Sequence, residues 1–216
     1  MNRLRRRVRV ALLRAAARDL LASRAIRTTW GRHPSESVDN QAFVGPGALV
    51  APWAVVGPGA VIAPGAVVAP LSAVAPAAIV GPGAVLAPFT AMAPGSVLGP
   101  GAVLAPLVVL SPGVFVGPGV FIGPATAIAP GVWIGRGAVI GAGVALAPGV
   151  RIGAGAQIGN GVAIAPSAVV EPGAVIPART AIGPHACVRG PEAPGSTASA
   201  ASHASAATAA LPAGAS

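Results

Sequence analysis

Aliphatic residues recur at every sixth position through most of this chain. The 150 residues from Phe43 to Glu192 divide into 25 consecutive hexads, without insertion or deletion. The second residue of every hexad is Val, Ile, Leu or Met, and the sixth is small or β-branched in all but the last. The segment SVDNQA at 37–42 fits as a degenerate additional hexad. The pattern predicts a short strand in each hexad, with the second side chain pointing inward and the first and third pointing outward.

Each hexad also carries a turn signal. The fourth residue is Pro in 19 of the 25 hexads, and the fifth is usually Gly. Pro followed by Gly favours a type II turn, because Pro presets the first φ angle and Gly accepts a positive φ at the next residue. We therefore expect a similar bend in every hexad, with the small sixth side chain tucked into the corner.

A longer period of 18 residues indicates how many hexads complete one turn. One row of fifth positions is Gly without exception from Gly47 to Gly173. One row of first positions is entirely Ala and Val, from Val55 to Ala181. These rows predict three hexads per turn of a triangular prism, whose stacked coils pair as parallel sheets. A second row of fifth positions is instead Trp53, Leu71, Phe89, Leu107, Ala125, Gly143, Gly161 and Arg179.

Composition excludes two other interpretations of the repeat. Residues 43–135 contain no Asp, Glu, Lys, Arg or His, so hydropathy alone would suggest a membrane span. A Pro in almost every hexad cannot continue through a transmembrane helix. Gly does not recur at every third position, which excludes a collagen triple helix.

The hexad form x-[VILM]-[GA]-P-G-[AV] resembles the hexapeptide repeat of left-handed parallel β-helix proteins, known from bacterial acyltransferases and γ-class carbonic anhydrases. The resemblance covers about 150 of the 216 residues. It implies an all-β solenoid, a left-handed parallel β-helix of 25–26 hexads in 8–9 triangular coils, over residues 37–192. The left hand comes from the resemblance alone, since the usual rule for crossover connections favours the right hand.

The two ends of the chain differ from the repeats. Residues 1–36 hold ten of the 14 Arg, and 3–26 are rich in helix formers, so we expect an N-terminal α-helix there. It would cap the first coil, contact anionic lipid or nucleic acid as a surface arm, or act as an organelle-targeting peptide. The lack of interleaved aromatic residues argues against nucleic acid. Residues 193–216 are rich in Ala and Ser and are expected to be disordered.

Charge and cysteine content narrow the class of protein to which this chain could belong. The formal net charge is +9, but it belongs mainly to the Arg-rich N-terminal segment. A single cysteine, Cys187, excludes an internal disulfide framework, and its expected role is that of a small outward residue. A cytoplasmic location fits best.

His185 is the candidate catalytic residue. The resemblance implies a histidine that acts as general base on the acyl acceptor, and imidazole titrates near neutral pH. The other two histidines, His33 and His203, lie outside the repeats. Three histidines this far apart do not form a zinc site, so we predict no metal. The alternative for His185 is a solvated turn residue.

The later hexads contain Arg136, Arg151 and Arg179, which are candidates for binding an anionic ligand. Nearby polar residues are Glu171, Arg189 and Asn160. The alternative is that these groups only increase solubility.

The row of Trp53, Leu71, Phe89 and Leu107 predicts a continuous apolar ridge about 15 Å long, given a coil spacing of about 4.8 Å. We expect this ridge to be an interface with a partner or another subunit, and the alternative is aggregation of an uncharged body. The family resemblance implies a homotrimer.

Three functional hypotheses follow. The first is a hexapeptide-type acyltransferase that moves an acyl group from a coenzyme A thioester, as co-substrate, to a hydroxyl or amine, with no tightly bound cofactor. The second is a non-catalytic scaffolding β-helix that self-assembles through apolar faces. The third is a repetitive GC-rich reading frame, or a deliberately idealised repeat, without an evolved function.

Overall fold

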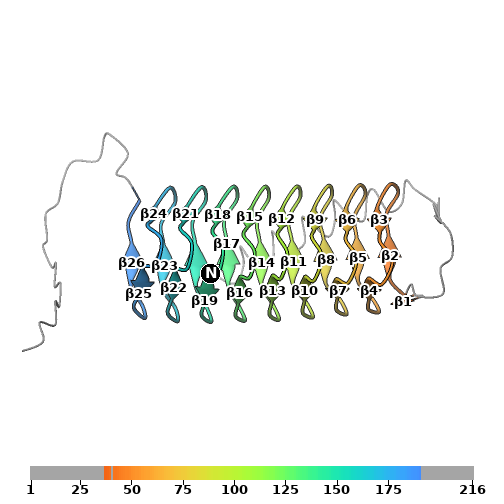
Figure 1. Cartoon of the computed structure of the whole chain (residues 1–216), viewed down its shortest axis with the longest axis horizontal. Helices are drawn as coiled ribbons and strands as arrows, with labels where there is room; N and C mark the ends of the chain where they lie inside the picture. Colours follow the sequence, from red (N-terminus) through yellow and green to blue (C-terminus); the bar gives the residue numbers. More distant parts are fainter. Residues whose placement is uncertain (1–36, 40, 191–216) are drawn as a thin grey trace, which may run out of the picture.

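Each hexad forms a two-residue strand, and the strands stack into a parallel solenoid. The computed structural model describes residues 37–39 and 41–190, and these contain 26 strands and no helix. Figure 1 shows the coils in a single row along the long axis, from β1–β3 at the orange end to β24–β26 at the blue end. Three strands make one turn, so the solenoid has eight turns and two further strands.

The strands form three parallel sheets, which are the faces of the prism. Sheet A contains β1 (Ser37–Val38), β4 (Val55–Val56), β7 (Ala73–Val74), β10 (Ala91–Met92), β13 (Val109–Leu110), β16 (Ala127–Ile128), β19 (Ala145–Leu146), β22 (Ala163–Ile164) and β25 (Ala181–Ile182). Sheet B contains β2 (Phe43–Val44), β5 (Val61–Ile62), β8 (Ile79–Val80), β11 (Val97–Leu98), β14 (Phe115–Val116), β17 (Trp133–Ile134), β20 (Arg151–Ile152), β23 (Val169–Val170) and β26 (Cys187–Val188). Sheet C contains β3 (Leu49–Val50), β6 (Val67–Val68), β9 (Val85–Leu86), β12 (Val103–Leu104), β15 (Phe121–Ile122), β18 (Val139–Ile140), β21 (Gln157–Ile158) and β24 (Val175–Ile176).

The strand register confirms the 18-residue period. Ala91 pairs with Val109, and Met92 with Leu110, in adjacent coils of sheet A. The first strand, β1, pairs with β4 in the same register, so residues 37–42 are a hexad of the solenoid. We refer to the edges of the prism by the sheets that they join: the C–A edge, the A–B edge and the B–C edge.

The aliphatic second positions form the core. Their side chains stack along the prism axis, and Ile62, Leu86, Leu104 and Ile134 are among those fully buried. The sixth positions are buried from Ala48 to Ala174, as predicted. Where the sixth residue carries a hydroxyl group, its oxygen donates to the carbonyl of the third residue of the same turn, as Thr90 does to Ala87 at 3.0 Å.

The turns have the predicted geometry. The amide of Ala48 donates to the carbonyl oxygen of Gly45 at 3.2 Å, and the intervening Gly47 has φ 71°. Every fifth position from Gly47 to His185 has a positive φ. The turns of adjacent coils are also joined by hydrogen bonds. The amide of Gly65, for example, donates to the carbonyl oxygen of Pro46 at 3.2 Å.

The prediction for the third positions is wrong. None of them is exposed from Gly45 to Glu171. A Cβ added at Gly99 would lie 2.6 Å from the carbonyl carbon of Gly117 in the next coil. The chain bends at the third residue, so this residue packs against the following coil rather than facing water.

Three other expectations are not tested by this architecture. The helix over 3–26 and the tail over 193–216 lie outside the described residues, as do His33 and His203. The left hand of the coil stays a prediction from the resemblance. Within the described part of the chain, no helix is long and apolar enough to cross a membrane.

Candidate functional site

A shallow apolar groove runs along the C-terminal half of sheet A. Its floor is made by the outward first residues of five consecutive strands, which are Ala in four strands and Val in one. Small outward side chains line this face, and the space has a volume of about 560 Å³. The floor residues are Val109, Ala127, Ala145, Ala163 and Ala181.

Two polar residues flank β25, the last strand of the groove. Arg179 lies at the C–A edge, two residues before this strand begins. His185 lies at the A–B edge, three residues after the strand ends at Ile182. Both side chains are exposed, and the two residues have positive φ angles of 60° and 56°. The two side chains thus flank the last strand of the groove, and neither belongs to the residues that line it.

His185 is held by its backbone. Its amide donates to the carbonyl oxygen of Pro166 in the preceding coil at 3.1 Å, which fixes the turn that carries the side chain. Within residues 37–39 and 41–190, the imidazole itself has no hydrogen-bond partner. In the part of the chain that the structure describes, no side chain sets the orientation of the ring.

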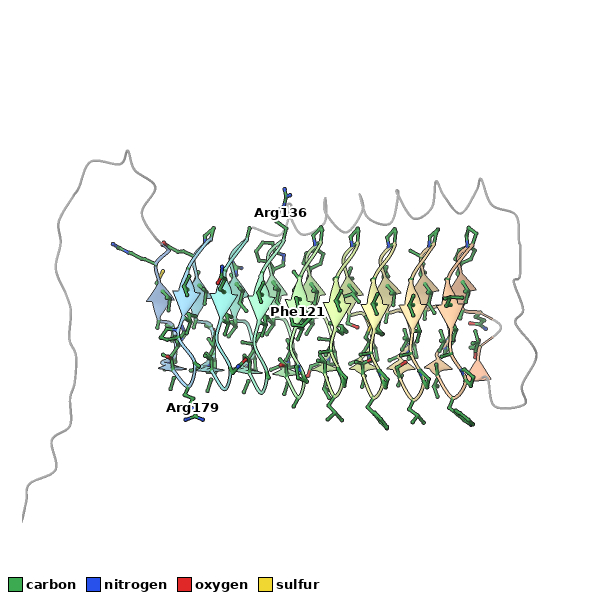
Figure 2. The ribbon with its side chains drawn as sticks, turned by 45° about the horizontal axis from the view of Figure 1, so that its top comes forward. Phe121, Arg136 and Arg179 are labelled. Atoms are coloured by element: carbon green, nitrogen blue, oxygen red, sulfur yellow. The ribbon has the colours of Figure 1, made fainter. Side chains whose placement is uncertain are left out.

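The structure separates the three candidate arginines. Arg136 lies at the B–C edge, Arg151 is the outward first residue of β20 on sheet B, and Arg179 lies at the C–A edge. Figure 2 shows Arg136 and Arg179 projecting from opposite sides of the prism. These arginines do not line a common groove, and Arg179 is the member of this set that borders the groove on sheet A.

Cys187 and Glu171 meet near the last coil, at the end of sheet B. The Cys187 Sγ lies 3.7 Å from Glu171 Oε1, and Cys187 is exposed. Among the described residues, no group of three or more His, Cys, Asp or Glu side chains could hold a metal ion.

The apolar ridge predicted from the sequence has the expected position. Trp53, Leu71, Phe89 and Leu107 lie on the C–A edge in four consecutive coils, because each precedes a strand of sheet A by two residues. All four side chains are exposed. The groove begins at β13, two residues after Leu107, so ridge and groove follow one another along the same side of the prism.

Sequence reasoning missed the groove. The row of alanines at 18-residue spacing was the available signal, since these small outward residues make the floor of the groove. The six-residue period places Arg179 and His185 in consecutive turns around a single strand.

A family model described as bacterial transferase hexapeptide (six repeats) matches residues 113–148. The chain is a hexapeptide-repeat β-solenoid. The matched segment of the solenoid contains β16 and β19, two strands of the groove on sheet A. Among curated proteins, none matches the sequence.

Comparison with solved structures finds similarity to this hexapeptide-repeat solenoid. The UDP-N-acetylglucosamine acyltransferase of Arabidopsis is 17% identical with a TM-score of 0.53, over 72% of this chain and 62% of that chain. The enzyme of that name from Bacteroides fragilis is 15% identical with a TM-score of 0.39, over 65% and 60% of the two chains. The acetyltransferase domain of PglB from Neisseria gonorrhoeae, in complex with acetyl coenzyme A, is 26% identical with a TM-score of 0.26, over 58% and 54%. The solenoid thus spans less than two thirds of each of these chains, and the likeness to the Arabidopsis enzyme shows the fold.

Proposed function

We propose that this protein is an acyltransferase that moves an acyl group from a coenzyme A thioester to a hydroxyl or amine at the C-terminal end of the sheet A groove. The observation that carries the proposal is the position of Arg179 and His185 on either side of β25, where the apolar groove ends. The hexapeptide transferase match over residues 113–148 supports the same class of reaction.

The groove suits the extended part of a thioester. Five coils at about 4.8 Å spacing give it a length of about 19 Å, enough for a pantetheine arm or a short acyl chain. Its floor of alanine methyl groups favours apolar contact without side chains that would block the chain. Arg179 would bind a phosphate of the donor, because guanidinium forms bidentate hydrogen bonds with phosphate oxygens.

His185 would act as the general base. Its imidazole removes the proton from the acceptor hydroxyl or amine, and the acceptor atom attacks the thioester carbonyl carbon. The new C–O or C–N bond forms, the C–S bond breaks, and the imidazolium returns the proton to the leaving thiolate. Imidazole suits this exchange because it gains and loses a proton near neutral pH.

A scaffolding role through self-assembly is the second candidate. The observation that favours it is the row of exposed apolar side chains from Trp53 to Leu107, which a second copy of the chain could cover. The homotrimer and the cytoplasmic location remain predictions for either function.

Paired binding and activity measurements test the proposal. We expect acetyl coenzyme A to raise the melting temperature of the wild type, and thiol release to follow addition of an acceptor amine. His185→Ala should abolish thiol release while keeping the thermal shift, and Arg179→Ala should reduce the shift. Arg136→Ala, an exposed arginine at another edge, is the matched control. The proposed function would be rejected if acetyl coenzyme A did not change the melting temperature of the wild type, or if His185→Ala released thiol as fast as the wild type.

A further inference from the structure

The ridge on the C–A edge is a convex, apolar surface. Trp53, Leu71, Phe89 and Leu107 have exposed fractions of 61%, 52%, 55% and 57%. At a coil spacing of about 4.8 Å, these four side chains form a line about 15 Å long. Soluble proteins seldom line up large exposed apolar side chains without a binding role.

The backbone at the ridge is unfavourable for these residue types. Their φ angles are 59°, 59°, 60° and 62°, in the left-handed region that disfavours residues with a Cβ. The B–C edge of the same coils has Gly at the equivalent position, from Gly47 to Gly101. Folding alone would favour Gly at the ridge too, so the four large side chains serve something other than the turn.

The surroundings of the ridge are also uncharged and apolar. The outward residues beside it on sheet A include Val55 and Val109, and those on sheet C include Leu49, each about half exposed. No charged residue occurs from Phe43 to Gly135. A protruding edge has no concave pocket for the side chain of a partner protein. It can instead insert into a membrane, at the boundary between lipid head groups and acyl chains.

The sequence that precedes the first coil is strongly basic. Ten of the 14 Arg lie in the first 32 residues of the sequence. The chain enters the solenoid at β1, which pairs with β4, and β4 begins two residues after Trp53. Arg32 is five residues before Ser37, so covalent reach keeps it within about 18 Å of the first coil. A basic segment joined to the first coil complements anionic head groups.

We propose that the C–A edge is a docking surface for an anionic membrane. The ridge side chains enter the interfacial layer, and the basic sequence that precedes β1 favours anionic head groups. This surface lies N-terminal to the groove along the prism, so it does not depend on the proposed acyl transfer.

Vesicle sedimentation with the full chain tests the proposal. We expect the wild type to bind vesicles of phosphatidylcholine and phosphatidylserine more tightly than vesicles of phosphatidylcholine alone, with binding weakened by salt. Trp53→Gly with Phe89→Gly should lower affinity for the mixed vesicles by at least about tenfold, because the variant removes two large aromatic contacts with the interfacial layer. Gly is the residue used at equivalent turns, so this variant keeps a compatible backbone.

Phe121→Thr is the matched control. Phe121 is an aromatic residue on sheet C, 44% exposed, and it is not part of the ridge (Figure 2). This variant should bind mixed vesicles like the wild type. Equal binding by the ridge variant and the wild type, or no vesicle binding by the wild type, would overturn the proposal. A lower molecular mass of the ridge variant in light scattering would assign the ridge to a second copy of the chain instead, and would also overturn it.

Discussion

The side-chain oxygen of Asn160 accepts a hydrogen bond from the backbone amide of Ala142, one coil away, at 2.8 Å. Both residues occupy the fourth position of their hexads, where most other hexads have Pro. Pro has no amide hydrogen, so an Ala at position 142 brings a donor that needs a partner. Asn160 supplies that partner 18 residues later.

Loss of this contact should lower stability modestly. Asn160→Ala removes the acceptor for the Ala142 amide and should reduce the free energy of unfolding by about 1 kcal/mol. A denaturant titration of the wild type and the variant would measure the difference. The control combines Asn160→Pro with Ala142→Pro, which restores the usual turn residue and removes the unpaired donor. This double variant should be at least as stable as the wild type, and a loss equal to that of Asn160→Ala would contradict the explanation.

Truncating one core residue should lower the free energy of unfolding much more than Asn160→Ala does. Leu104 is fully buried at the second position of β12, in the middle of the solenoid. Leu104→Ala should reduce the free energy of unfolding by about 2–5 kcal/mol, because it removes buried area and leaves a cavity. Val103→Ala, in the outward position of the same strand, should cost less than about 1 kcal/mol. Comparable losses for the two variants in thermal melts would show that the inward and outward positions are assigned incorrectly.

Glycine at the ridge should leave the fold intact or make it slightly more stable. Trp53→Gly with Phe89→Gly relieves two left-handed residues, each of which costs roughly 1–2 kcal/mol. Gly also raises the entropy of the unfolded chain, which lowers the free energy of unfolding by about 0.4–1 kcal/mol at each site. We therefore expect a net gain of about 1 kcal/mol in a thermal melt. A marked loss of stability would mean that these side chains support the prism itself.

Filling the groove should weaken thioester binding without unfolding the protein. Ala145→Trp places a large ring on the floor of the groove, at an outward and exposed position. The thermal shift produced by acetyl coenzyme A should fall by at least half if the groove holds the donor. Val139→Trp, at the outward position of β18 on sheet C, is the control for a large ring on a different face. An unchanged shift in Ala145→Trp would place the donor elsewhere.

Much of the fold followed from two periods in the sequence. The aliphatic second residue predicted the core, and the 18-residue rows predicted the strand pairs, because both are imposed by the geometry of a repeated coil. The third position was predicted incorrectly, because close packing between coils depends on how the chain bends at residues such as Gly99. The sequence alone does not show that bend.

The site was less predictable than the fold. Arg136 and Arg179 were grouped because both lie in the later hexads, yet they differ in their place within the 18-residue period and therefore lie on different edges. Arg179 and His185 lie six residues apart, which places them in successive turns around β25. The groove is formed by side chains from five coils, and it was recognised only in the three-dimensional structure.

The final coil carries features that the middle coils lack. Among the described residues, β24, β25 and β26 are the last members of their sheets, where a further strand of the same shape could pair. Pro177, Arg179 and Arg189 lie in the turns next to these strands, all exposed. Proline cannot donate to an added strand, and exposed charged side chains disfavour pairing at a sheet edge. Pro177 and the two arginines thus disfavour the docking of another solenoid onto this coil, so the repeat itself carries residues that oppose unlimited end-to-end growth.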